Sequence, residues 1–422
     1  LMALIWIAGV PFFHAPWEPY EPYVVAIVKS IINTNSWLVP YLTPSAPYLE
    51  LQPFYFWLFA LIIKVFHFSD IANAVRLINA LIIFGVIALM GQIGSGLSAF
   101  RNGRSVIMIL ISCVGFINNA YQLSPNIVVL FGFSLYFYAL QKSAHMPGIS
   151  AWLLSIGLIF ISLNFTAQFI VIALLILFIL PLLSKEWRTP EFLNCAGGGL
   201  ALFTLLFGSY VWQLNSVDHA FYLEWEGKYL SFISFNLADY GQSALFLVET
   251  LAWYLIPAWV LVIWTLYKRR SRIFQDKILT LSLLSSGLLL LFAVLSGQHD
   301  ESVIFPIIIP FVLLASVEID SIKITIVSLL NWFCIFTFGL AGAFIATLYI
   351  ALNFGRPHEL FIKAKYYAPN YAFQFNVWQL ALAVLITFIW LFMITRKHIR
   401  GREMVTNWAS GSTFVLVMFI SL

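Results

Sequence analysis

Charged residues are scarce in this sequence, since Asp, Glu, Lys and Arg together make up only 9% of its 422 residues. Soluble domains carry about 25% charged residues. Hydrophobic residues reach 62%, and the mean hydropathy is +0.93. These values exclude an ordinary soluble globular protein. The small net charge of +4 is spread over several loops, so we expect no nucleic-acid-binding face.

Cysteine is also rare. Cys113, Cys195 and Cys334 all fall inside apolar stretches, where a thiol acts as a small core residue. No His, Cys, Asp or Glu cluster has the spacing of metal ligands. We therefore predict no disulfide framework, no metal site and no bound cofactor.

Long apolar runs dominate what remains. A helix needs about 20 residues to cross a bilayer, and these runs are rich in Leu, Ile and Phe without strand-like alternation. We predict an all-α polytopic membrane protein with about thirteen transmembrane helices in a single domain over residues 1–422. The predicted spans are Leu1–Phe13, Leu77–Gly96, Val106–Leu123, Pro125–Leu140, Ile149–Leu163, Ala167–Leu183, Leu193–Trp212, Leu247–Tyr267, Ile278–Ser296, Val303–Val317, Ile324–Leu352, Val377–Thr395 and Thr413–Leu422.

The distribution of Lys and Arg orients these spans. Basic residues mark cytoplasmic loops, and 15 of the 22 Lys and Arg fall in loops on one predicted side. Most carboxylates fall on the other side. We take this acidic side as the outer side. Besides the outer loop over residues 14–75, it holds three predicted loops, Gln213–Glu249, 298–302 and Asn353–Asn376. Phe54–Phe66 is too short to span and is expected to lie on the outer surface as an interfacial helix.

Polar residues concentrate in Trp17–Trp57, which we call the motif segment. It holds Glu18, Glu21 and Glu50, and seven prolines at positions 16 to 53 interrupt this region and prevent one long helix. Taken alone, such a segment is more often a solvated acidic loop than a site. Its residue order, however, favours a specific relationship.

The motif segment resembles the C-type membrane glycosyltransferases, in the branch of the lipid A aminoarabinose transferases and protein O-mannosyltransferases. That branch reads Trp-Glu-Pro-Asp-Glu-x-x-Tyr, Gly-Asp-Trp-Leu-Val-Pro and Pro-Tyr-x-Glu-Lys-Pro-Pro. The corresponding stretches here are Trp17–Tyr23, Asn35–Pro40 and Pro47–Pro53. Arg76 matches the arginine that opens the family's next span. Residues 298–306 are similar to the family's later Lys-Arg-Asp-x-Tyr-x-x-x-Pro motif.

Several charged positions of that pattern are replaced. Tyr20 stands where the family has its proposed catalytic Asp, and Leu51 and Gln52 stand where it has Lys and Pro. Gln298 and His299 occupy the positions of a basic pair. The aminoarabinose enzymes also carry a soluble C-terminal domain, which we do not expect in this chain.

The resemblance implies transfer of a sugar from a polyprenyl-phosphate donor to a lipid, glycan or protein acceptor. It also implies a bacterial inner membrane, with the site facing the periplasm. A carboxylate would take the acceptor's proton, and Glu21 or Glu18 is the expected catalytic residue. The expected substrate-binding residues are Tyr20, Tyr23, Glu50, His299, Asp300 and Arg356.

Two alternatives remain open. The missing Asp and Lys motivate the first, a degenerate family member that binds a lipid-linked sugar or a partner without catalysis. A polytopic lipid or solute transporter would instead show broken spans with buried charge. The apolar spans contain few ionisable residues, which disfavours the transporter.

Overall fold

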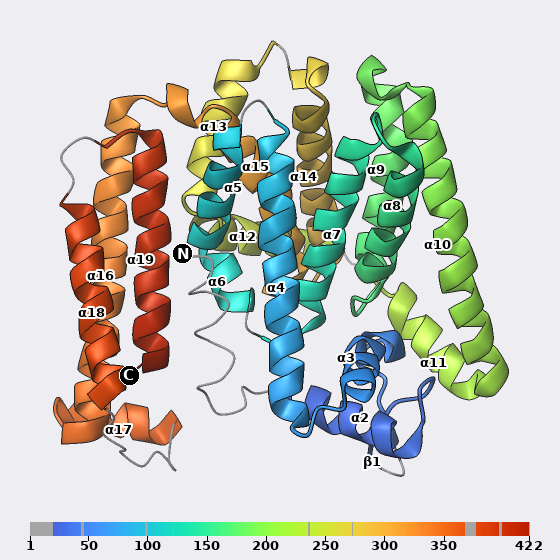
Figure 1. Cartoon of the computed structure of the whole chain (residues 1–422), viewed down its shortest axis with the longest axis horizontal. Coiled ribbons are helices and arrows are strands. Elements are labelled where there is room, and N and C mark those ends of the chain that lie inside the picture. Colours follow the sequence, from blue (N-terminus) through green and yellow to red (C-terminus); the bar gives the residue numbers. More distant parts are fainter. Residues whose placement is uncertain are drawn as a thin grey trace. The chain divides into compact units, whose positions relative to one another are not determined.

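The computed structural model describes residues 20–43, 46–97, 100–120, 122–234, 237–271, 273–367, 377–395 and 399–421. These residues are overwhelmingly helical (Figure 1), which confirms the all-α prediction. The chain divides into two compact units, of which the larger ends at Glu318 and the smaller begins at Ile319. The single domain predicted over residues 1–422 stays a prediction.

The larger unit contains most of the helices. Its elements are α2 (Tyr20–Thr34), β1 (Tyr41–Thr43), β2 (Ala46–Pro47), α3 (Pro53–Phe66), α4 (Ile71–Ser95), α5 (Phe100–Ser112), α6 (Val114–Ala120), α7 (Pro125–Lys142), α8 (Pro147–Ser162), α9 (Gln168–Leu183), η1 (Lys185–Trp187), α10 (Pro190–Val217), α11 (His219–Leu230), α12 (Leu237–Tyr254), α13 (Ala258–Arg269), η2 (Ile273–Gln275), α14 (Lys277–Leu295), η3 (Glu301–Val303), η4 (Phe305–Ile307) and α15 (Ile308–Val317). The smaller unit contains η5 (Ile319–Ser321), α16 (Ile324–Phe354), α17 (His358–Tyr367), α18 (Val377–Ile394) and α19 (Gly401–Ser421).

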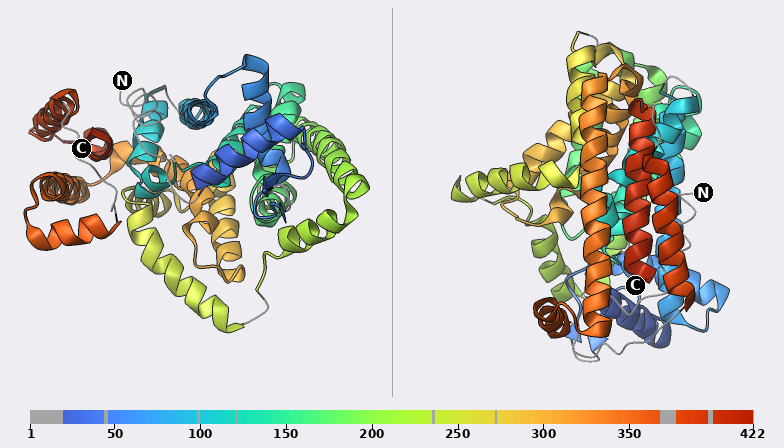
Figure 2. Two further views of the ribbon diagram at one scale, coloured as in Figure 1. Left: turned by 90° about the horizontal axis from the view of Figure 1, so that it is seen from below. Right: turned by 90° about the vertical axis from the view of Figure 1, so that its left-hand side faces the viewer.

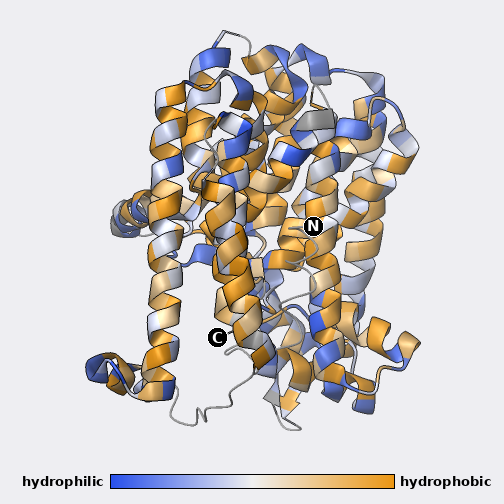
Figure 3. Ribbon diagram, turned by 60° about the vertical axis from the view of Figure 1, so that its left-hand side comes forward, coloured by the Kyte–Doolittle hydropathy of each residue, from blue (hydrophilic) through white to orange (hydrophobic). Residues whose placement is uncertain are grey.

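Apolar residues follow the lengths of the long helices, whereas polar residues gather near their ends (Figure 3). Among the described residues, α4, α10, α14 and α16 are each long and apolar enough to cross a membrane. Two bent helix pairs raise that number to six if each pair is one span. These helices agree with an integral membrane protein, and the total of thirteen spans stays a prediction.

Two of the predicted spans are broken helices. The span predicted at Val106–Leu123 divides into α5 and α6 at Cys113, with a bend of 71°. The hydroxyl of Ser112 and the thiol of Cys113 bond carbonyls one turn earlier, a pattern that bends helices. The span predicted at Leu247–Tyr267 divides into α12 and α13, bent by 98°. Pro257 lies at that break and lacks the N–H that a continuing helix requires.

The predicted outer loop Gln213–Glu249 is mostly helical, which corrects the sequence-based reading. Asp218 ends α10 and begins α11, because its carboxylate accepts a hydrogen bond from the backbone N–H of Phe221. One face of α11 then buries Phe221, Trp225 and Tyr229. Similarly, α17 forms within the loop predicted at Asn353–Asn376. Hydropathy missed both helices because they are short and only partly apolar.

The described part of the motif segment lies at one end of the larger unit. There α2 runs across the ends of the longer helices and contacts α3 and α4 (Figure 2). The 14-residue helix α3 is shorter than a membrane span, as expected for Phe54–Phe66. Trp57 donates a hydrogen bond of 2.5 Å from Nε1 to the carbonyl of Trp37. The two indole rings also meet edge to face, with centroids 6.3 Å apart. These tryptophans therefore join the connection between α2 and β1, which contains Trp37, to α3.

Helices α7 and α8 cross closely at two glycines. A Cβ atom on Gly132 would lie 2.8 Å from both the carbonyl oxygen of Gly157 and the backbone nitrogen of Ile161. A Cβ atom on Gly157 would lie 3.0 Å from the carbonyl of Gly132. Small residues at such a crossing let helix backbones approach closely in an apolar environment.

In the smaller unit, α19 packs against α16 and α18. Asn407 of α19 donates a hydrogen bond of 2.9 Å to Asn331 of α16, and both side chains are buried. Trp408 donates to the backbone carbonyl of Leu330. These buried bonds satisfy polar groups that would otherwise destabilise an apolar bundle.

Gly132→Ala should lower the stability of the larger unit by about 1 to 3 kcal/mol, because the added methyl group meets backbone that cannot move aside. Gly148→Ala on α8 is the control, since no atom lies within 4 Å of its Cβ position. Thermal unfolding in detergent measures both. Equal unfolding temperatures for the two variants would contradict the close crossing.

Trp37→Ala should destabilise the protein by about 1 to 2 kcal/mol, because it removes the edge-to-face contact with Trp57 and the cation–π contact with Lys64. Glu50→Ala, at an exposed position of the same segment, should change stability by less than about 0.5 kcal/mol. The comparison uses folded yield and unfolding temperature in detergent. A larger loss for Glu50→Ala would refute this role of Trp37.

Candidate functional site

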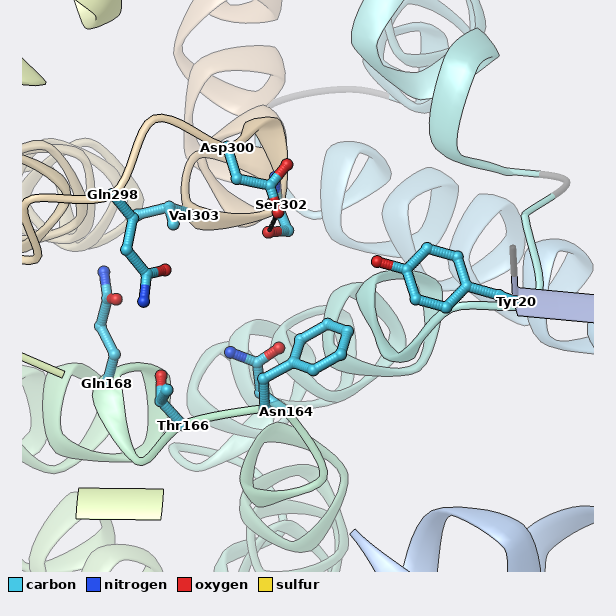
Figure 4. A pocket seen from close by; sticks show the side chains of 9 residues that line it. Tyr20, Asn164, Thr166, Gln168, Gln298, Asp300, Ser302 and Val303 are labelled. Atoms are coloured by element: carbon cyan, nitrogen blue, oxygen red, sulfur yellow. Dashed lines mark hydrogen bonds between the residues drawn. The ribbon is translucent and has the colours of Figure 1, made fainter. Parts of the chain in front are cut away.

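A cavity of about 200 Å³ lies within the larger unit, where three connecting segments meet (Figure 4). Tyr20 enters it from the beginning of α2. The turn between α8 and α9 supplies three lining residues and the first residue of α9 a fourth, and the segment after α14 supplies four more. The complete described lining is Tyr20, Asn164, Phe165, Thr166, Gln168, Gln298, Asp300, Ser302 and Val303.

The turn between α8 and α9 is held from outside by Tyr229 of α11. The Tyr229 hydroxyl donates a hydrogen bond of 3.1 Å to the carbonyl of Ser162. Its own backbone carbonyl accepts a bond of 2.8 Å from the N–H of Ala167. One residue thus fixes both sides of the turn, and this fixes the positions of Asn164 and Gln168 in the cavity wall.

The same residue links the cavity to the motif segment. The Trp225 ring stacks on the Tyr229 ring, with centroids 5.1 Å apart. Trp225 Nε1 donates a hydrogen bond of 2.7 Å to Oε1 of Gln52, which is buried. Gln52 stands where the resembling family has proline. The glutamine that replaces proline therefore has a structural role, because the buried indole N–H of Trp225 requires a hydrogen-bond acceptor.

The segment after α14 is positioned by a turn at Gly297, whose positive φ of 67° suits glycine. Asp300 then begins η3, and its carboxylate accepts hydrogen bonds from the backbone N–H and the hydroxyl of Ser302. Asn118 of α6 donates a bond of 2.9 Å to Glu301. Asp300 is consequently an exposed carboxylate with a fixed orientation at the cavity.

Tyr20 lies opposite Asp300 and packs its ring against Phe165, with centroids 6.2 Å apart (Figure 4). Burial raises the pKa of Tyr20 above its usual value, and the carboxylates of Asp300 and Glu50 raise it further. Tyr20 therefore keeps its proton near neutral pH and acts as a hydrogen-bond donor. The cavity thus joins Tyr20 of the first motif with Asp300 of the later one.

Glu21 lies beside the cavity residue Tyr20 but is not part of the described lining. It is only 3% exposed and forms an ion pair with Nε of Arg76, at the beginning of α4. Two of the charged residues that match the family pattern thus pair with each other. Their contact joins α2 to α4.

The other predicted site residues have different surroundings. Tyr23 is exposed and stacks on Tyr48, whose hydroxyl donates a bond of 3.4 Å to the exposed Glu50. His299 is exposed and meets the ring of Phe246 on α12, with centroids 5.9 Å apart. Arg356 is exposed and belongs to the smaller unit, between α16 and α17. Glu18 lies outside the described residues.

Sequence analysis missed Asn164 and Gln168 as site residues. Their signal was weak, because Asn164-Phe165-Thr166 matches only a glycosylation sequence within an apolar hairpin. The structure buries Asn164 to 6% and Gln168 to 2% exposure. The one sequence signal that could have identified them is the presence of two polar side chains in an otherwise apolar hairpin.

Comparison with solved structures identifies the same fold elsewhere. The crystal structure of ArnT from Cupriavidus metallidurans bound to undecaprenyl phosphate matches with a TM-score of 0.71 and 12% identity, over 100% of this chain and 75% of that one. The apo form of the same protein matches with a TM-score of 0.68 and 13% identity, over 99% and 74%. No model of a known protein family and no curated protein matches the sequence. The resemblance to C-type membrane glycosyltransferases is thereby confirmed at the level of the fold.

Arg76→Met should destabilise the larger unit by about 3 kcal/mol, because it leaves the buried Glu21 carboxylate without its guanidinium partner. The double variant Glu21→Met, Arg76→Met should recover part of that loss. Thermal unfolding of the three proteins measures the difference.

Arg402→Met is the matched control, because Arg402 pairs with an Asp320 side chain that is 66% exposed. Exposed pairs contribute at most about 1 kcal/mol, so this change should be small. Equal losses for Arg76→Met and Arg402→Met would argue against a structural role for the buried pair.

Proposed function

We propose that this protein is a membrane glycosyltransferase that moves a sugar from a polyprenyl-phosphate donor to a lipid, glycan or protein acceptor. The observation that carries the proposal is the cavity, which brings Tyr20 and Asp300 together from the two motifs. Its fold is shared with an ArnT crystallised with undecaprenyl phosphate. The proposal includes about thirteen spans, a bacterial inner membrane and a periplasmic site.

We assign the acceptor-side chemistry to Asp300. An acceptor hydroxyl needs a carboxylate to take or orient its proton, and Asp300 is the carboxylate that lines the cavity. The sequence favoured Glu21 for this role. Glu21 instead pairs with Arg76, and this contact orients α2 and Tyr20.

The leaving lipid phosphate requires donors or cations. One such group is His299, which adjoins the cavity residue Gln298 in the chain. Tyr23 and Glu50 would contact the substrate outside the cavity. These assignments extend the resemblance to residues that depart from the family pattern.

A second function is binding of a lipid-linked sugar without transfer. One observation favours it: none of the nine described residues that line the cavity is Lys, Arg or His. A transferase without such groups would stabilise its leaving phosphate poorly. The protein would then hold a lipid-linked sugar for another enzyme or act as a sensor of it.

Radiolabelled polyprenyl-phosphate sugars test the two functions in membrane vesicles that contain the protein. A transferase should release the label from the donor into a new product, and Asp300→Asn should lower that rate by about 100-fold or more. Glu224→Gln changes an exposed carboxylate on α11 and is the control. Glu21→Gln should lower the rate less than Asp300→Asn does.

The outcomes separate the hypotheses. Donor that binds but stays intact supports the binding function. Loss of transfer in Glu21→Gln with full activity in Asp300→Asn would return the catalytic role to Glu21. Absence of both binding and transfer would overturn both functions.

A further inference from the structure

Two buried polar atoms in the cavity wall have no hydrogen-bond partner within the described part of the chain. They are Oδ1 of Asn164, an acceptor, and Nε2 of Gln168, a donor. Both belong to side chains that are more than nine-tenths buried. Buried polar groups are ordinarily paired, and an unpaired one is destabilising by about 1 to 3 kcal/mol. The wall thus offers unused hydrogen-bonding capacity to a ligand.

The unpaired atoms lie on a well-anchored turn. Tyr229 bonds the backbone at Ser162, before Asn164, and at Ala167, directly before Gln168, and Trp225 links Tyr229 to Gln52 in the motif segment. The carboxamides of Gln168 and Gln298 point into the same space from opposite walls (Figure 4). The polar groups are therefore presented to the cavity by a preorganised frame, which favours binding because less ordering is required.

The combination of groups selects the chemistry of the ligand. Asn164 needs a donor and Gln168 needs an acceptor, and a hydroxyl group supplies both. A phosphate dianion offers acceptors only. The carboxylate of Asp300 would also repel a phosphate at close range, and the nine described lining residues include no cation to offset that repulsion.

We infer that the cavity is a subsite for one uncharged sugar ring, held by the carboxamides of Asn164, Gln168 and Gln298. The inference rests on the proposed function and deepens it, because it places the sugar in the cavity and the lipid phosphate outside it. Tyr20 and Phe165 provide aromatic surface for the apolar face of the ring. Tyr20 also donates a hydrogen bond to a ring oxygen substituent.

The cavity size agrees with this ligand. Its volume of about 200 Å³ is below the roughly 300 to 1,000 Å³ of sites for drug-sized molecules. A single hexose or pentose ring is therefore a better match than a sugar together with its phosphate and the first prenyl unit.

Binding of two kinds of short-chain probe, farnesyl phosphate and its sugar esters, tests the inference. Farnesyl phosphate is compared with its glucosyl, mannosyl and arabinosyl esters, on purified full-length protein in nanodiscs. At least one ester should bind more tightly than farnesyl phosphate itself. Gln168→Leu and Asn164→Leu should each weaken ester binding roughly five- to tenfold and leave farnesyl phosphate binding unchanged.

Gln298→Leu is a further variant, because its exposed side chain can be changed without disturbing the fold. It should weaken ester binding in the same way. Gln213→Leu, at an exposed position on α10, is the matched control and should bind both probes as the unaltered protein does.

Different binding results would contradict the inference and the proposed function. Equal weakening of both probes by Gln168→Leu and Gln298→Leu would place the phosphate in the cavity and overturn the inference. Equal affinity of the unaltered protein for farnesyl phosphate and all three esters would overturn the inference and leave the proposed function intact. Binding of neither probe would overturn the proposed function and the subsite together.

Discussion

An apolar surrounding leaves backbone N–H and C=O groups without water, so each must be satisfied within the protein. This constraint explains why the chain is helical along most of its length. It also means that a helix ends or bends where another group supplies the missing bond or where proline removes the donor. The site occupies such places, at the beginning of α2, at the turn between α8 and α9, and before η3.

A small set of polar contacts organises this region. Glu21 and Arg76 join α2 to α4, while Gln52, Trp225 and Tyr229 join the motif segment to the turn that carries Asn164. The substitutions relative to the resembling family therefore differ in kind. Gln52 gains a specific partner and is integrated into the structure. Tyr20 keeps its place at the cavity, although a phenol replaces the carboxylate.

These contacts shape the chemistry that remains available. The described lining combines carboxamides, hydroxyls and one carboxylate, which suits the hydroxyl groups of a sugar. The charge that a phosphate would require is absent from that lining and must come from neighbouring segments if transfer occurs. Under the proposed function, the sugar and the phosphate would therefore be recognised by different residues.

The sequence by itself determined the all-α membrane class, because low charge and long apolar runs leave few other structures. It also determined the resemblance that the fold confirms, since the Trp, Pro and Glu spacing of the motif segment is specific. It identified Tyr20 and Asp300 in separate motifs. It could not show that they share one cavity, since 280 residues separate them and hydropathy carries no pairing information.

Only the tertiary structure decided the bends at Cys113 and Pro257, the helix α11 and the partners of Glu21. The bends follow from local hydrogen bonds and from a proline, which hydropathy does not register, whereas Glu21 pairs with Arg76, 55 positions away. The roles of Asn164 and Gln168 are the clearest case, because in sequence they are isolated polar residues in an apolar hairpin. They line the cavity because Tyr229, more than 60 residues away, fixes the turn between α8 and α9 with two hydrogen bonds.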